Sequence, residues 1–195
     1  MPRSASPARH KLPNQVRIIG GLWKRTPLPV ADRPGLRPTP DRVRETLFNW
    51  LGQDLTGWHC VDAFAGTGAL GLEAASRGAA DVLLVEAEGA LVDQLRAIAR
   101  KLDAANVRVQ RGNALSALAA LPPASVDLVF LDPPFEADLF DKALAAARPA
   151  LRPQGFLYLE APSEWQGEAL ARHALEQVRH MKAGAVHGHL LRPVA

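Results

Sequence analysis

The chain has 195 residues, and 48% of them are hydrophobic, which suffices to bury one sizeable core with a small appendage. No apolar stretch reaches the roughly 18 residues that a membrane-spanning helix needs, and no hydrophobic signal segment follows the N-terminal charges. Cys60 is the only cysteine and falls in a predicted strand, where we expect a small buried hydrophobe. A soluble protein of a reducing cytoplasm is the expectation.

The formal net charge of +3 conceals an uneven distribution. Residues 1–44 hold ten Lys/Arg against two acidic residues, whereas the rest of the chain holds 13 Lys/Arg against 18 acidic residues. The basic N-terminal segment is therefore a candidate nucleic-acid contact beside an acidic body. Within it, residues 1–15 contain Arg and Pro and no acid, and we expect a disordered basic tail.

Residues 16–38 predict a small β-hairpin and a linker. Val16–Ile19 and Leu22–Lys24 are the expected strands, with a turn at Gly20 and Gly21. Basic and aromatic residues interleave here, which favours RNA docking over an ordinary solvated surface. The candidate RNA-binding residues are Arg17, Trp23, Lys24, Arg25, Arg37 and Arg42.

Residues 39–195 predict the main domain. Thr39 and Pro40 are the expected cap and first residue of a helix that runs to about Gly52. From Trp58 onward, short apolar strands alternate with helices, which implies a parallel sheet with right-handed crossovers. The helices are expected at Ala69–Arg77, Ala90–Leu102, Leu115–Leu121 and Leu139–Leu151. After a strand at Gly155–Glu160, the segments Leu175–Met181 and Ala185–Arg192 predict an edge hairpin.

A glycine-rich turn follows the first strand of this domain. Gly66, Gly68 and Gly71 match G-x-G-x-x-G, and Glu86 ends the next strand 20 residues after Gly66, where it can accept from ribose hydroxyls. This pattern alone fits nicotinamide cofactors and S-adenosylmethionine equally. Asp62 precedes the turn, and its carboxylate would repel a pyrophosphate but attract the ammonium and sulfonium groups of S-adenosylmethionine. The sequence therefore favours the methyl donor.

Asn113 follows the third strand, at the same predicted edge of the sheet. Its amide can accept from and donate to an adenine edge. Asparagine is also among the best helix caps, so it equally predicts the start of the helix at Ala114.

Asp132-Pro133-Pro134-Phe135 directly follows the apolar strand Val126–Leu131. Proline has a restricted φ and no N–H, so the carbonyl groups here are held in a rigid loop at the strand end. The Asp132 carboxylate and the Pro133 carbonyl can accept the two N–H groups of an exocyclic amine and turn its lone pair out of conjugation. The Phe135 ring offers a face on which a base can stack. A strand-ending turn is the plain alternative, and the full tetrapeptide favours catalysis.

The histidines predict no metal site. His187 and His189 are expected to face one side of a strand, but no cysteine or carboxylate cluster accompanies them. His173 and His180 are expected at the surface.

Together these residues resemble the RsmD family of bacterial 16S rRNA (guanine-N2)-methyltransferases from about Val16 onward. The carriers are Arg17-Ile18-Ile19-Gly20-Gly21, Arg37-Pro38-Thr39, Arg42-Val43-Arg44-Glu45, Phe48-Asn49-Trp50-Leu51, the loop from Asp62 to Gly71, Glu86 and Asp132-Pro133-Pro134-Phe135.

The resemblance implies a Rossmann-like α/β class I methyltransferase fold. It has a seven-stranded, mostly parallel sheet, a reversed C-terminal edge hairpin and a small N-terminal β-hairpin. It also implies methyl transfer from S-adenosylmethionine to N2 of a guanine in 16S rRNA of the small ribosomal subunit, by a cytoplasmic protein that we expect to be a monomer. The implied cofactor-binding residues are Asp62, Phe64, Gly66, Gly68, Glu86, Asn113 and Ala114. Many related enzymes have Asp where this chain has Asn113.

Three other functions remain open at this point. A DNA or protein-glutamine amino-methyltransferase would use the same proline loop, and only the N-terminal hairpin argues against it. A nicotinamide-dependent oxidoreductase would leave the proline loop without a role. A noncatalytic RNA-binding module would have no use for Asp62, Glu86 and that loop together.

Overall fold

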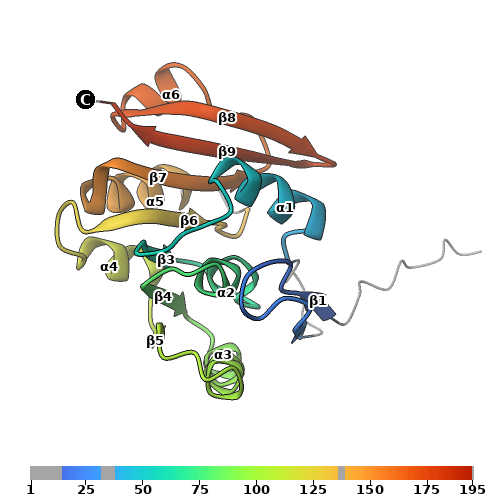
Figure 1. The fold of residues 1–195 in the computed structure, drawn as a ribbon. Coiled ribbons are helices and arrows are strands. Elements are labelled where there is room, and N and C mark those ends of the chain that lie inside the picture. The colour runs from blue at the N-terminus through green and yellow to red at the C-terminus, as the bar shows by residue number, and fades with distance from the viewer. Residues whose placement is uncertain (1–14, 32–37, 136–138, 195) are drawn as a thin grey trace, which may run out of the picture.

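A computed structural model describes residues 15–31, 38–135 and 139–194. The described chain forms a two-stranded sheet and a seven-stranded sheet with the order β5-β4-β3-β6-β7-β9-β8 (Figure 1). This order confirms the predicted mixed sheet with its reversed edge hairpin. The strands of the large sheet are β3 (His59–Asp62), β4 (Asp81–Glu86), β5 (Val107–Arg111), β6 (Val126–Leu131), β7 (Leu151–Ala161), β8 (Leu175–Ala183) and β9 (Val186–Pro193).

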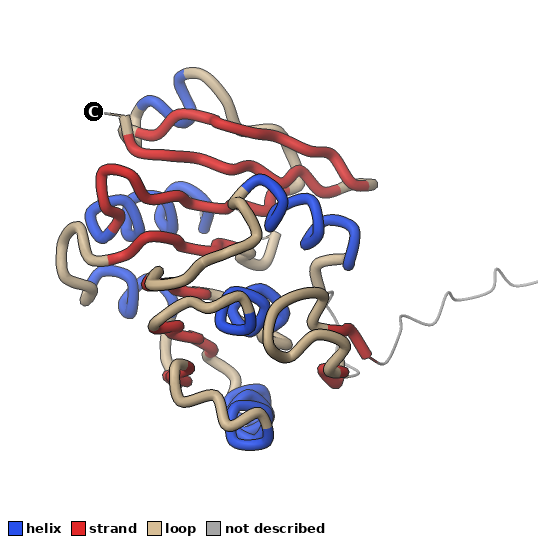
Figure 2. Tube along the Cα trace, viewed as in Figure 1, coloured by secondary structure: helices blue, strands red, loops and turns tan. Residues whose placement is uncertain are grey.

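Helices cover both faces of the large sheet, so its central strands are buried on two sides (Figure 2). One face packs against α1 (Asp41–Trp50), α2 (Ala69–Ser76) and α3 (Gly89–Lys101). The other face packs against α4 (Ala114–Ala119), α5 (Leu139–Ala147) and α6 (Glu168–Ala171), with a 3-10 turn at Arg148–Ala150. Neighbouring residues alternate between the two cores: Phe130 and Tyr158 belong to the first, Val129 and Leu159 to the second. None of the described helices is long and apolar enough to cross a membrane.

The chain reverses its direction of travel across the sheet between β3 and β6. From β3 it proceeds outward to β4 and β5, and it then returns to the other side of β3 as β6. In sheets of this kind, ligands bind outside the carboxyl ends of the strands at that reversal. The fold therefore places the candidate site beside the ends of β3 and β6.

The N-terminal hairpin exists, but its second strand is not the predicted one. β1 (Gln15–Arg17) pairs with β2 (Pro27–Pro29), and Val16 lies opposite Leu28. The segment Leu22–Lys24 lies instead in the connecting turn. The Leu22 amide donates to the carbonyl of Ser76 at the end of α2 (2.7 Å), so this turn packs on a helix rather than pairing as a strand. The expected tail lies outside the described residues except for Gln15.

The expected cap of the first helix is also wrong. Pro40 occupies the cap position of α1, which has no side-chain cap, and the helix begins at Asp41. The Thr39 hydroxyl instead donates to Glu160 Oε1 at 2.7 Å. Thr39 therefore bonds to a residue far away in the sequence instead of capping the helix that follows it.

The other predicted helices and strands lie within a few residues of their expected bounds. The largest difference is at α5, which ends at Ala147, so that β7 starts at Leu151 rather than Gly155. β7 is irregular there, because its register with β6 shifts between Val126 and Leu128.

Candidate functional site

Four acidic residues lie at the carboxyl ends of adjacent parallel strands. Asp62 ends β3, Glu86 ends β4, Asp132 follows β6, and Glu160 lies one residue before the end of β7. Asp62 pairs in register with Phe130, and Leu131 pairs with Leu159. The structure thus brings together the three acids that the sequence selected and adds Glu160.

Asp62 is buried and holds the glycine loop. Its Oδ2 accepts from the Gly71 amide at 2.9 Å, and its carboxylate also accepts from the Phe64 amide. Burial, with a smaller contribution from nearby Glu86 and Glu160, raises the pKa of Asp62 to about 7. An ionised Asp62 is therefore costly until a cation approaches it.

The glycines bring α2 close to the sheet. Gly68 has a φ of +78° and stands at the N-terminal cap of α2, a conformation that favours glycine. A Cβ atom on Gly71 would lie 2.2 Å from the Leu84 side chain, so the third glycine permits close helix–sheet packing.

Glu86 links the loops that follow β3 and β4. Its Oε2 accepts from the Gly66 amide and its Oε1 accepts from the Glu88 amide, both at 2.9 Å. A carboxylate offers about four acceptor positions, so these two bonds orient Glu86 and leave capacity for a ligand.

Asn113 caps α4, because its Oδ1 accepts from the Ser116 amide at 3.1 Å. Ala114 is buried behind it. The capping role is confirmed, and adenine binding by these two residues stays a prediction.

The proline loop presents a half-buried carboxylate and an exposed ring. Pro133 is buried, whereas Pro134 is exposed and Phe135 keeps 51% of its surface accessible. No described residue donates a hydrogen bond to the Asp132 carboxylate. Burial and then the charges of Glu160 and Asp62 raise the pKa of Asp132 well above its usual value. The loop therefore offers an acceptor and a stacking face toward a ligand.

Glu160 was not selected from the sequence. Its Oε1 accepts from the Thr39 hydroxyl at 2.7 Å and from the Tyr158 hydroxyl at 3.1 Å, and burial raises its pKa. Its position could have been found, because an acid at the end of the predicted strand beside Asp132 had to reach the same edge of the sheet.

Another buried carboxylate, that of Glu73 in α2, fastens the N-terminal hairpin to the main domain. It accepts from the amides of Ile19 and Gly20, each at 2.7 Å. It also forms ion pairs with Arg44 (3.3 Å) and Arg77 (2.8 Å). Nothing in the apolar pattern of α2 marks Glu73 as this anchor, which depends on contacts between distant segments.

Most of the predicted RNA-binding residues are exposed. Arg17, Lys24 and Arg25 lie on the hairpin, and Arg42 lies at the start of α1. Trp23 is partly buried and packs against the core, so its ring is less available than the sequence suggests. Arg37 lies outside the described residues.

Three histidines meet on the edge hairpin. His180 was expected at the surface, and its Nε2 lies 2.9 Å from His187 Nδ1. One ring nitrogen from each of His180, His187 and His189 lies within 4.8 Å of the other two. His189 Nε2 accepts from the Trp165 amide at 2.9 Å, and burial lowers the pKa of His189 to about 4. Neutral His189 thus holds the loop after β7.

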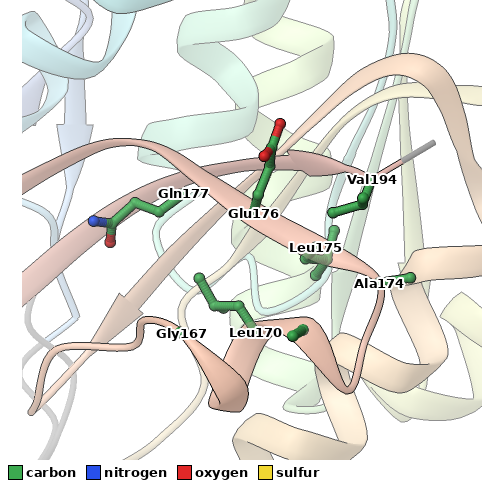
Figure 3. Close-up of a pocket in the computed structure, with 8 residues that line it drawn as sticks. Gly167, Leu170, Ala174, Leu175, Glu176, Gln177 and Val194 are labelled. Atoms are coloured by element: carbon green, nitrogen blue, oxygen red, sulfur yellow. The ribbon is translucent and has the colours of Figure 1, made fainter.

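A pocket of about 490 Å³ lies elsewhere, between α6 and the start of β8 (Figure 3). Its lining includes Leu170, Leu175 and Val194. Because β9 runs antiparallel to β7, Val194 lies near the amino ends of the parallel strands, whereas Asp132 lies at their carboxyl ends. This pocket is therefore separate from the acidic site.

Comparisons with known proteins show the family of the chain. The family model described as "Conserved hypothetical protein 95" matches residues 16–192. Ribosomal RNA small subunit methyltransferase D of Escherichia coli is 50% identical over 135 residues, which are 69% of this chain and 68% of that protein. The protein of the same name from Haemophilus influenzae is 39% identical over 155 residues, 77% of this chain and 80% of that protein.

Solved structures show the same fold. Escherichia coli yhhF, a protein described as a methyltransferase, superimposes with a TM-score of 0.80 at 42% identity, covering 93% of this chain and 99% of that one. The sheet order, the strand-end acids and the family match lead to one assignment: the chain belongs to the RsmD family of methyltransferases, with the class I methyltransferase fold.

Proposed function

We propose that this protein transfers a methyl group from S-adenosylmethionine to the exocyclic N2 of a guanine in 16S rRNA of the small ribosomal subunit. The observation that carries the proposal is the convergence of Asp62, Glu86 and Asp132 on one sheet edge beside the proline loop. The names of the relatives support ribosomal RNA as the substrate class.

The charge of the site fits the proposed cofactor. Asp62, Asp132 and Glu160 have raised pKa values, and Glu160 contributes to the shifts of the other two. A ligand with a sulfonium and an ammonium group would relieve this repulsion, whereas a pyrophosphate would add to it. S-adenosylmethionine supplies a methyl group on a cationic sulfur, which leaves as a neutral thioether.

Each part of the site has a role in holding that cofactor. Asp62 and the glycine loop, with Phe64, would hold the methionine portion, and Glu86 would accept from the ribose hydroxyls. Asn113 and Ala114 would lie against the adenine. The two amides that Glu86 already accepts from keep its carboxylate oriented before the cofactor arrives.

The proline loop would prepare the target amine. The Asp132 carboxylate and the Pro133 carbonyl would accept its two N–H groups, and Phe135 would stack on the base. The nitrogen forms its bond to the methyl carbon as the carbon–sulfur bond breaks and its electron pair stays on sulfur. The Asp132 carboxylate then stabilises the positive charge on nitrogen and can take the surplus proton.

The hairpin within residues 16–38 would dock the rRNA, and residues 39–195 would form the methyltransferase domain. Glu73 would hold the two parts together, because it ties the hairpin loop to α2, the helix that follows the glycine turn. The protein would act as a monomer in the cytoplasm, where the ribosomal subunits are.

The test is transfer of labelled methyl groups from S-adenosylmethionine to four separate acceptors: small ribosomal subunits lacking the modification, free 16S rRNA, DNA and protein. We expect label in 16S rRNA, with subunits as the best acceptor. Label only in DNA or in protein would replace this function with that of another amino-methyltransferase.

A further inference from the structure

We propose that Glu160 selects guanine, by accepting the N1–H of the target base while Asp132 accepts from its exocyclic amine. This inference rests on the proposed function and names the residue that would make its site specific for one base.

The two carboxylates leave the sheet side by side. Leu131 and Leu159 are paired on neighbouring parallel strands, and Asp132 and Glu160 are the next residue of each strand. Neighbouring strands lie about 4.8 Å apart. Phe130 and Tyr158, two residues earlier, belong to the same hydrophobic core, so the alternation of side chains directs both acids to the α1 and α2 face.

One oxygen of Glu160 is held and the other remains available. The hydroxyls of Thr39 and Tyr158 both donate to Oε1. No described residue donates to Oε2. Arg44 fixes Thr39 in turn, because its Nε donates to the Thr39 carbonyl at 3.1 Å. A buried carboxylate is thus oriented by two donors while one oxygen is left to accept from a ligand.

Guanine matches a pair of adjacent acceptors better than the other amino bases do. Its Watson–Crick edge presents N1–H beside the N2 amine, which are neighbouring donors. Adenine and cytosine present a ring nitrogen with a lone pair beside their amine, and that lone pair would face the Glu160 carboxylate. An enzyme recognises a base that has been taken out of its stack by hydrogen bonds to this Watson–Crick edge. Where two hydrogen-bond acceptors, a ring nitrogen and the carboxylate, face each other, the wrong base is rejected.

The experiment compares two target bases with the same amine. Synthetic 16S rRNA would carry either guanine or 2-aminopurine at the methylated position, because 2-aminopurine keeps the amine but has a lone pair at N1. Wild-type protein and Glu160→Gln would be measured for kcat/KM on both RNAs. Glu176→Gln, an exposed acid of β8, is the matched control.

We expect wild-type protein and Glu176→Gln to prefer guanine strongly. In Glu160→Gln the guanine preference should fall by about 10- to 100-fold, the scale of one hydrogen bond to a charged group. The reason is that the glutamine amide can turn its NH₂ toward the N1 lone pair. 2-Aminopurine also lacks O6, but this difference affects every variant and cancels when the preferences are compared.

Three results would overturn the inference: an unchanged preference, an equal loss of kcat/KM on both RNAs, or a loss of S-adenosylmethionine affinity that accounts for the defect. If Glu160→Gln does not fold, Thr39→Val replaces it. That variant removes one of the two hydroxyl donors that orient the carboxylate and should also relax the preference, and an unchanged preference would again count against Glu160. If wild-type protein methylates neither the guanine RNA nor small ribosomal subunits that lack the modification, the proposed function itself fails.

Discussion

Asp132 and Glu160 stand next to each other at the ends of β6 and β7, directly after the paired residues Leu131 and Leu159. Each lies in the other's electrostatic field, and the Glu160 charge contributes to the raised pKa of Asp132. A site that gathers negative charge without a described basic partner for Asp132 is suited to a cationic cofactor and an amine donor.

Replacing Asp132 should separate acceptance of the amine from binding of the cofactor. Asp132→Asn keeps a carbonyl acceptor and should retain measurable single-turnover methylation, whereas Asp132→Ala should lose about 10²-fold or more, the effect of removing one preorganised polar group. Phe135→Ala should slow transfer by misplacing the base while sparing S-adenosylmethionine affinity. Wild-type rates for Asp132→Ala would eliminate the amine-activation mechanism, and a parallel loss of cofactor affinity would make the loop structural.

Glu86→Ala should weaken S-adenosylmethionine binding by about 1–3 kcal/mol, because the ribose hydroxyls lose a charged acceptor. The amides of Gly66 and Glu88 would lose their partner as well, so the variant needs a melting curve beside its calorimetric titration. Asp93→Ala is the matched control, since Asp93 is 82% exposed on α3. A folded Glu86→Ala protein with normal affinity would remove Glu86 from the cofactor site.

The pKa of Asp62 makes the stability of the ligand-free protein depend on pH. Folded Asp62 holds its proton to about pH 7, whereas its ordinary value is 3.8, so its contribution to stability is present at low pH and is lost as pH rises toward 7. Relative to Asp62→Asn, the unfolding free energy of the wild type should fall by about 2–3 kcal/mol between pH 5 and pH 7.5. Denaturant titrations at both pH values measure this, and parallel pH profiles would show that Asp62 is already ionised at pH 5.

The contact of the hairpin with α2 can be tested at Gly21. A Cβ atom there would lie 1.8 Å from the Ser76 carbonyl oxygen, and Gly21 has a φ of +74°. Gly52 has a φ of +91° but open space around it, so Gly52→Ala is a control for backbone strain alone. Gly21→Ala should destabilise the protein by about 1–3 kcal/mol more than Gly52→Ala does. Equal losses would mean that the hairpin loop does not pack on α2 in solution.

RNA docking is better tested by charge than by deletion. Removing residues 1–31 would take away Leu28, which is buried in the core, and would expose the residues that pack against it. Glu73 would also lose the amides of Ile19 and Gly20 as donors. A deletion would therefore not distinguish a loss of docking from a loss of folding. Arg17→Ala, Lys24→Ala and Arg25→Ala combined should weaken rRNA binding and flatten its salt dependence by about one unit of slope per lost phosphate contact. Cofactor affinity should be unchanged.

The control for docking is Lys101→Ala, which removes an exposed charge from the end of α3. If the triple variant binds and methylates its RNA with the wild-type salt dependence, the hairpin is not the docking surface.

The parts of the fold that could be predicted were those set by local pattern. The run Val126–Leu131 matches β6 residue for residue, because every residue except Asp127 is apolar and buried, as in a strand covered on both faces. The hairpin partner and the role of Thr39 could not be predicted in this way. In both cases a distant group, Ser76 or Glu160, takes the hydrogen bond that local rules assign to a neighbour.

The same distinction applies to the site. Asp62, Glu86 and Asp132 were found because each stands beside a motif with its own signature. Glu160 lacks a motif. It ends the predicted strand Gly155–Glu160, which places it at the carboxyl edge of the sheet, and the sheet order with β7 beside β6 places it next to Asp132.

The most direct test of the central claim is the chemical identity of the methylated nucleoside. Small ribosomal subunits treated with wild-type protein and S-adenosylmethionine would be digested to nucleosides and analysed by mass spectrometry, with Asp132→Ala as the inactive control. We expect N2-methylguanosine from 16S rRNA, at up to one per subunit. Methylated adenosine or cytidine in its place, or no methylated nucleoside at all, would contradict it.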